Sequence, residues 1–229
     1  MAVYTINIKL ISSTLIGSGS GFGANIDADV ILDECGIPYL PAKRVKGCLR
    51  DSALEILDMF KEANISENKE IFSKENLDFV FGTPGKKQPA PVYFHDLTIS
   101  SEDKQWLQYF MNKFHAIISQ DTITDALTEL RRQTAIEEET GVADPHSLRT
   151  IRVVQKDKEF FGKIEISEQI TEEEKNIVEK VLEYACKNLK HLGTKRNRGF
   201  GYVECKLLDS NQKDMTANVL ERLEKICKD

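Results

Sequence analysis

The chain has 229 residues, of which 41% are hydrophobic and 30% are charged, and its net charge is −6. This composition is ordinary for a soluble protein that buries a real core, in one domain with insertions or in two small ones. The acidic total excludes a protein coated with positive charge for nucleic acid, so any nucleic-acid site must be a local basic patch.

The five cysteines stand singly, and none belongs to a CxxC pair. This odd, scattered set excludes a disulfide framework and a structural zinc site, and it favours reduced cysteines in a cytosolic protein. No apolar run is long enough to cross a membrane, and the chain starts directly in a strand pattern. We therefore expect neither a membrane span nor a signal peptide.

In chain order, residues 2–13 come first and alternate apolar and polar side chains, which predicts a half-buried strand. A glycine-rich loop follows, with glycine at every second position from 17 to 23. Residues 26–33 predict a short strand or extended segment, and Pro41 stands where a helix can begin. Glycine lets the backbone come close to a ligand, so this loop is a candidate for phosphate contacts.

Residues 43–62 carry apolar side chains at helical spacing and predict an amphipathic helix. Lys43, Lys46 and Arg50 fall on one line along the edge of the apolar stripe, and no acidic residue lies between Glu34 and Asp51. Two interpretations stay open for this row of cations: a solvated helix flank, or a row of phosphate contacts.

The middle of the chain is less regular. It predicts a short helix around 69–80, a strand over 92–97, a short helix after Ser100 or Ser101 that contains Trp106 and Phe110, and a short strand over 115–119. Residues 148–154 and 159–166 predict two strands that pair with each other through the turn at 155–158.

A capping box of Thr171 and Glu174 begins the clearest helix, predicted over 171–192 and ended by Gly193. A second acid-free stretch follows, because five Lys or Arg and no Asp or Glu lie between Tyr184 and Val203. A strand over 200–208 and a helix over 216–228 close the chain. Without insertions the order is strand, helix, strands, helix, strand, which predicts an α+β, ferredoxin-like fold.

Several familiar sites are excluded. The glycines of residues 17–23 run into an extended segment, whereas those of a dinucleotide-binding loop open a helix. The sequence has no GxxxxGK[ST] motif and no nucleophile-elbow motif, and its four histidines are far apart.

With these residues quoted, the chain resembles the RAMP superfamily of CRISPR-associated proteins. More narrowly, it resembles the repeating backbone subunit of type III effector complexes of the Csm or Cmr kind. Four pieces carry the resemblance: the loop ending in Ile26-Asp27, the segment Ile37-Pro38-Tyr39-Leu40-Pro41-Ala42-Lys43-Arg44-Val45-Lys46-Gly47, the stretch 140–151, and the glycine-rich run from Gly193 to Gly201.

The resemblance implies one RAMP domain over residues 1–229, with a ferredoxin-like, RRM-related core, helical insertions at about 64–118 and an inserted thumb hairpin at about 131–163. In this family, copies stack along the CRISPR RNA, and each thumb displaces a nucleotide of the guide–target duplex. The implied partners are CRISPR RNA, target RNA, further copies or paralogues of the chain and other type III subunits, in the cytoplasm of a prokaryote.

By position, the aspartate that cuts target RNA in such subunits matches Asp27. A carboxylate on a loop can hold Mg²⁺ or Mn²⁺ beside a phosphate, and a displaced nucleotide lets its own 2′-hydroxyl attack in line. Asp29 and Asp33 are rivals, and Asp29 would face the same way as Asp27 in an extended segment and share the metal.

By the same resemblance, a set of cations and glycines becomes the surface that holds guide-RNA phosphates. These residues are Lys43, Arg44, Lys46, Arg50, Gly193, Lys195, Arg196, Arg198, Gly199 and Gly201. Phosphate contacts position an RNA without reading its sequence, which suits a subunit that accepts any guide. One departure is the run Glu137, Glu138 and Glu139 in the expected thumb, which would repel RNA and could instead face a protein neighbour.

Three alternatives to a target-RNA nuclease stay open. Asp27 could be idle in a purely structural RNA-binding subunit. A stand-alone RNA-processing enzyme would need a histidine at the scissile bond, and His191 is the one placed for it. An RRM-like binder of single strands would stack bases on Phe200 and Tyr202 of the last strand.

Overall fold

The computed structural model describes residues 2–21, 23, 25–63, 71–83, 85, 89–144 and 146–226. In chain order the elements are β1 (Ala2–Leu10), α1 (Ala42–Glu62), α2 (Lys74–Phe81), β2 (Val92–Phe94), α3 (Ser101–Lys113), α4 (Gln120–Leu127), β3 (Thr128–Gln133), β4 (Arg149–Val154), β5 (Glu159–Ile166), α5 (Glu172–Asn188), the short 3₁₀ turn η1 (Arg196–Arg198), β6 (Val203–Leu208) and α6 (Val219–Ile226). Within this described part, no helix is both long and apolar enough to span a bilayer.

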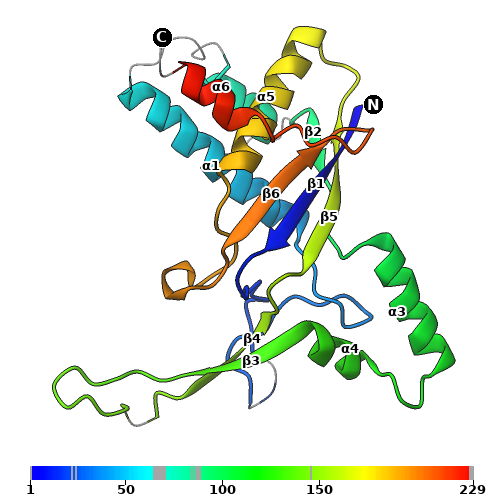
Figure 1. Ribbon diagram of the computed structural model, residues 1–229, viewed down its shortest axis with the longest axis vertical. Helices are drawn as coiled ribbons and strands as arrows, with labels where there is room; N and C mark the ends of the chain where they lie inside the picture. The colour runs from blue at the N-terminus through cyan, green and yellow to red at the C-terminus, as the bar shows by residue number, and fades with distance from the viewer. Residues whose placement is uncertain are drawn as a thin grey trace.

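The central sheet has the strand order β2-β5-β1-β6, with every neighbouring pair antiparallel. Together with α1 and α5, which lie side by side behind it (Figure 1), this is the ferredoxin-like arrangement expected from the sequence. The elements α2, α3 and α4 and the hairpin of β3 and β4 are insertions into that plan, and the hairpin projects well away from the sheet (Figure 1).

The core forms where β1 meets the helices. Tyr4, Ile6, Ile8 and Leu10 alternate along β1 and are all buried, as the period of a half-buried strand requires. The buried residues of α1 are the predicted stripe. The Ser52 hydroxyl on that stripe donates a 2.9 Å hydrogen bond to the Ala185 carbonyl, which ties α1 to α5.

The prediction that residues 148–154 pair with 159–166 is wrong, although both strands exist. β4 pairs with β3 in a separate two-stranded sheet, while β5 lies between β1 and β2. The turn between them is held by β1 instead, because Asp157 N–H donates to the Leu10 carbonyl and Leu10 N–H donates to the Lys158 carbonyl. The hairpin therefore occupies residues 128–154, and residues 159–163, expected within the inserted hairpin, belong to the central sheet.

Three further local predictions differ. Residues 115–119 form no strand: 115–117 turn after α3, and Ser119 caps α4, which was not foreseen. The helix capped by Thr171 is α5, which ends at Asn188, because the Leu192 N–H donates to the Gly201 carbonyl and the Val203 N–H donates to the Lys190 carbonyl. The helix expected at 69–80 is α2, which starts at Lys74; positions 69, 70, 227 and 228 lie outside the described residues.

Candidate nucleic-acid interface

The two acid-free stretches of the sequence meet in space. Arg44 and Gly47 in the first turns of α1 line a hollow of about 280 Å³ together with Gly193 and Arg196 of the glycine-rich loop. Both arginines are exposed. Since no acidic side chain other than Asp51 lines this hollow, the fold builds a local basic patch on an acidic protein.

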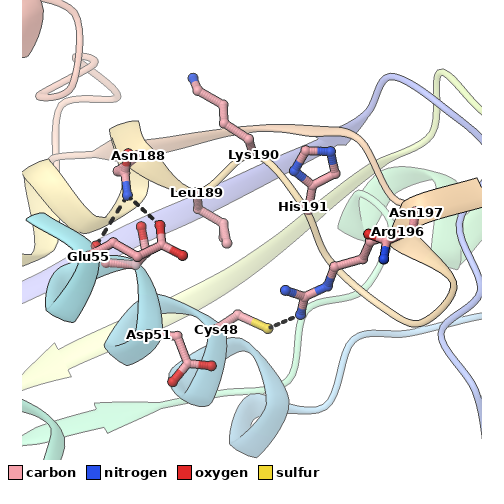
Figure 2. A pocket seen from close by; sticks show the side chains of 10 residues that line it. Cys48, Asp51, Glu55, Asn188, Leu189, Lys190, His191, Arg196 and Asn197 are labelled. Carbon is pink, nitrogen blue, oxygen red and sulfur yellow. Dashed lines mark hydrogen bonds between the residues drawn. The ribbon is translucent and has the colours of Figure 1, made fainter. Parts of the chain in front are cut away.

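The hollow continues toward α5, and Figure 2 shows its walls. Arg196 extends from the loop toward α1, where its Nη2 lies 3.9 Å from the Cys48 Sγ. Asp51 and Glu55 stand on the α1 wall, and this second part has a volume of about 430 Å³. Burial raises the pKa of the Cys48 thiol, while the nearby Arg196 lowers it. The Cys48 thiol thus adds an uncharged side chain to the lining of the patch.

The shape of the glycine-rich loop depends on left-handed backbone positions, among them Gly193, Gly199 and Gly201. A Cβ at Gly201 would lie 2.1 Å from the Leu192 carbonyl oxygen, and one at Gly193 would lie 2.5 Å from that of Leu15. A Cβ at Gly199 would meet nothing within 4 Å. Two of the three predicted RNA-binding glycines are therefore needed for packing, and only Gly199 leaves open space for a ligand.

The far side of the same loop reaches the base of the hairpin. The Lys195 ammonium donates a 2.7 Å hydrogen bond to Gln133 Oε1 on β3. Lys195, Arg198 and Arg149 line a groove of about 900 Å³ between the loop and the hairpin. Burial, followed by Arg198 and Arg149, lowers the pKa of Lys195, and Asp27 acts in the opposite direction. A bound anion would relieve the repulsion among these three cations.

Asp27 lies at this hairpin base. Its N–H donates to the Thr150 carbonyl at 2.8 Å, and its Oδ2 accepts from the Thr150 N–H at 2.7 Å. The residue is exposed, and it acts electrostatically on Lys195. Two hydrogen bonds to one residue of β4 thus fix an accessible carboxylate beside a basic groove.

Asp29 has a different environment. It is buried, its Oδ1 accepts from the Val30 N–H at 2.7 Å, and its Oδ2 lies 3.3 Å from Arg152 Nη1 on β4. Asp33 also has partners, the N–H groups of Cys35 and Ile37 and the ammonium of Lys104. These two carboxylates are engaged in holding the chain, which leaves Asp27 as the accessible one of the three.

Of these three aspartates, Asp27 alone offers an accessible carboxylate, so a metal ion here would have one carboxylate ligand. Among the described residues, no three His, Cys, Asp or Glu side chains form a cluster that could hold a metal ion. Mg²⁺ commonly binds proteins through one or two carboxylates, and it completes its shell with waters and substrate phosphates. Asp27 matches that requirement, whereas the pairing of Asp29 with Arg152 argues against a second ligand there.

The row of cations on α1 is only partly free. Lys43 is exposed, but the Lys46 ammonium lies 5.8 Å from the centre of the Phe94 ring, and burial followed by Arg50 lowers its pKa. Arg50 forms a 2.7 Å ion pair with Asp78 of α2. The inserted α2 and the edge strand β2 of the central sheet cover this end of the row, so Lys43 is its accessible member. Arg44, next to Lys43 in the sequence, is exposed as well.

The residues of the remaining alternatives lie elsewhere. His191 packs beside Tyr202 with ring centres 5.6 Å apart, and it lines the hollow of Figure 2 rather than the hairpin groove. Phe200 and Tyr202 precede β6 instead of lying on it. Sequence reasoning missed Arg149 and Gln133, and the available signal was the four arginines at 131, 132, 149 and 152.

Comparison with known proteins agrees with this architecture. The family model described as the RAMP superfamily matches residues 7–204. The chain belongs to the RAMP superfamily. This RAMP protein also resembles a chain in the cryo-electron microscopy structure of the type III-B Cmr-β bound to cognate target RNA, with a TM-score of 0.63 and 15% identity over 90% of this chain and 97% of that one.

A chain of the apo state of the type III-B Cmr-β is similar as well, with a TM-score of 0.61 and 14% identity over 91% of this chain and 98% of that one. At such identities the likeness shows a shared fold. No curated protein matches the sequence.

The glycine pair in the loop gives a matched test of packing. Both Gly201→Ala and Gly199→Ala place an alanine in a left-handed conformation, which costs about 1–2 kcal/mol. Only Gly201→Ala also drives a Cβ into the Leu192 carbonyl, so it should lower the free energy of unfolding by clearly more. Urea unfolding of both variants measures the difference, and equal losses would contradict the assigned packing.

The buried pair of Asp29 and Arg152 should be costly to break. Asp29→Ala leaves a mostly buried guanidinium unpaired, and we expect a loss of about 3 kcal/mol in unfolding free energy. The double variant Asp29→Leu with Arg152→Met should recover much of that loss. As a control, Asp58→Ala removes an exposed ion pair with Lys61 and should cost less than about 1 kcal/mol.

Proposed function

We propose that this RAMP protein is an RNA-binding subunit of a type III effector complex, and that it cleaves target RNA through Asp27. The observation that carries the proposal is the placement of Asp27. Asp27 is exposed, and two hydrogen bonds with Thr150, one through its backbone N–H and one through its carboxylate, hold it at the hairpin base beside a groove lined by Lys195, Arg198 and Arg149. Membership of the superfamily and the similarity in fold to Cmr-β chains support the assignment.

The basic surface has two parts with different tasks. Arg44 and Arg196 form the patch between α1 and the glycine-rich loop, which suits the phosphates of a guide strand. Lys195, Arg198 and Arg149 form the hairpin groove, which suits the phosphates next to the scissile bond. Because the glycine-rich loop supplies cations to both parts, one RNA duplex could contact them together.

In the proposed reaction, the 2′-hydroxyl of a displaced nucleotide attacks the adjacent phosphorus, and the bond to the 5′-oxygen breaks. The products are a 2′,3′-cyclic phosphate and a 5′-hydroxyl; the hydroxyl proton goes to solvent, and the leaving oxygen takes a proton from solvent. A divalent ion held by Asp27 would neutralise charge on the phosphate. Lys195 and Arg198 stabilise the negative charge that accumulates on its oxygens.

Asp27→Asn tests the catalytic assignment, because the amide oxygen can still accept from the Thr150 N–H. We expect target-RNA cleavage by the assembled complex with Mg²⁺ to fall about 100-fold or more, with RNA binding unchanged. Asp125→Asn, at an exposed position of α4, is the matched control and should cut normally.

A target with a 2′-deoxy sugar at the cleaved position should resist cutting by the wild type. Unchanged cuts with Asp27→Asn would overturn the catalytic assignment and leave the subunit as an RNA-binding scaffold, with cleavage elsewhere.

Lys195→Gln and Arg198→Gln test the hairpin groove. Each should weaken binding of single-stranded RNA and reduce the slope of log affinity against log salt by about 0.7, since one phosphate contact is lost. Fluorescence anisotropy over a salt series measures both effects. As a control, Lys61→Gln changes an exposed lysine in the last turn of α1, which does not line the groove, and should leave the slope unchanged. A slope that Lys195→Gln does not alter would remove this lysine from the RNA surface.

A further inference from the structure

Helix α3 presents an aromatic face to solvent. Trp106, Tyr109, Phe110 and Phe114 are all exposed, and Trp106 has 59% of its surface accessible. The centres of the Trp106 and Phe110 rings lie 5.9 Å apart, and those of Phe110 and Phe114 lie 6.1 Å apart. Large exposed apolar patches are uncommon on monomers and mark interaction sites, and Trp and Tyr are enriched among the residues that dominate protein interfaces.

The opposite face of α3 holds the helix on the body of the protein. Leu107 and Met111 pack against the core, and the Lys104 ammonium lies 3.1 Å from Asp33 Oδ2. Figure 1 shows α3 at the margin of the molecule, clear of the central sheet and on the side away from the projecting hairpin. A second protein can therefore reach the aromatic face without covering the hairpin.

Charge is ordered along the exposed face of α3. Asp103, Trp106, Phe110 and Lys113 are spaced by three, four and three residues, so they share one line of the helix surface, and all four are exposed. We call these four residues the α3 seam. It runs from an acid in the first turn, through two rings, to a cation in the last turn. This spacing is that of the a and d positions of a coiled coil, at which two facing helices interlock.

The α3 seam is complementary to a copy of itself that runs in the opposite direction. In an antiparallel pair, Trp106 of each copy meets Phe110 of the other, and Asp103 of each copy meets Lys113 of the other. Both pairings occur in one register, because both are centred on position 108 of the helix. A parallel pair would instead place like charges side by side at each end, which is destabilising.

The cation at the end of the seam is available for this pairing. The Lys113 ammonium lies 5.3 Å from the centre of the Tyr109 ring and 5.5 Å from that of Phe114, and it donates a 2.9 Å hydrogen bond to the Tyr109 hydroxyl. These partners are two rings and a hydroxyl, so they position the positive charge without neutralising it.

We propose that the α3 seam binds the α3 seam of a second copy of this chain, antiparallel, in a closed dimer with two-fold symmetry. The rings of Trp106 and Phe110 pack across the axis, and two ion pairs between Asp103 and Lys113 set the direction and the register. Because both copies use the same surface, the contact is complete with two chains and adds no third. It goes beyond the proposed function, since it engages neither Asp27 nor the basic groove.

RNA is the competing occupant of the α3 seam, because bases stack on exposed aromatic side chains. Glu102 and Asp103 in the first turn would repel a phosphate backbone at one end of the seam. The self-complementary order of charges therefore favours a second copy, and RNA binding by α3 is an outcome that the experiment separates.

The chain carries its own reporter for this contact, because Trp106 is its single tryptophan. Burial of the indole in the dimer should shift its emission to shorter wavelength as the concentration of the full chain rises from about 1 µM to about 200 µM, a range that suits a small interface. Sedimentation velocity over the same range should show dimers in the absence of RNA.

Phe110→Ala removes one ring of each pair and keeps the reporter. It should raise the dissociation constant of the dimer at least tenfold. Phe110 is exposed, so the variant should fold, which circular dichroism and thermal melting check. The control Gln105→Ala with Asn112→Ala, at exposed polar positions beside the seam, should dimerise like the wild type.

Charge exchange tests the antiparallel register. Lys113→Glu opposes two acids at each end of the seam, and Asp103→Lys opposes two lysines, so each variant alone should dimerise about tenfold more weakly. Mixed one to one, the two variants form complementary pairs at both ends, and the mixture should regain the affinity of the wild type.

A wild type that stays monomeric at about 200 µM overturns the proposal. So do Phe110→Ala chains that dimerise like the wild type, and charge variants that do not recover on mixing. Quenching of Trp106 fluorescence by single-stranded RNA, in a chain that forms no dimer, assigns α3 to RNA instead. Failure of the proposed function appears separately, as cleavage that is insensitive to Asp27, and leaves the dimer unchanged.

Discussion

The candidate site depends on the docking of residues 27–29 along strand β4. Asp27 and Thr150 exchange two hydrogen bonds, Ala28 bridges Ile151, and Asp29 pairs with Arg152. Ordering a glycine-rich loop costs conformational entropy, and these contacts with β4 offset that cost. Because the hairpin supplies the fixed partner, the position of Asp27 follows the position of the hairpin. The proposed cleavage site is therefore fixed in position relative to the projecting hairpin.

The glycine-rich loop joins this site and the hairpin to the ferredoxin-like core. Arg196 faces α1, whereas Lys195, its neighbour in sequence, reaches Gln133 on the hairpin. The left-handed conformations of Lys195 and Gly199 produce the tight turn that sends adjacent cations to opposite sides. A single short loop thereby makes the proposed guide surface continuous with the proposed cleavage site, on a protein whose net charge is −6.

Ion pairing decides which of the charged residues are available. Arg50 is paired with Asp78, Arg152 with Asp29 and Arg222 with Glu183, and each pair is at least half-buried. Such charges stabilise the insertions and the closing helix, and a buried cation whose partner is removed is costly. Arg44, Arg196 and Arg198 remain exposed, so the basic patch is smaller than the count of Lys and Arg suggests.

The sequence by itself determined the elements whose signals are local. The period of β1, the apolar stripe of α1 and the capping box of α5 each act within a few residues, and the acid-free stretches marked the basic patch. The ferredoxin-like order followed from the sequence of these elements, and the superfamily was indicated by the resemblance of four motif segments. Only the tertiary structure decided that β4 pairs with β3 and that Arg149 lines the groove beside Asp27. It also decided that Arg50 and Asp29 are engaged in ion pairs, with Asp78 and Arg152. Those outcomes depend on contacts between residues far apart in the chain, which no local pattern encodes.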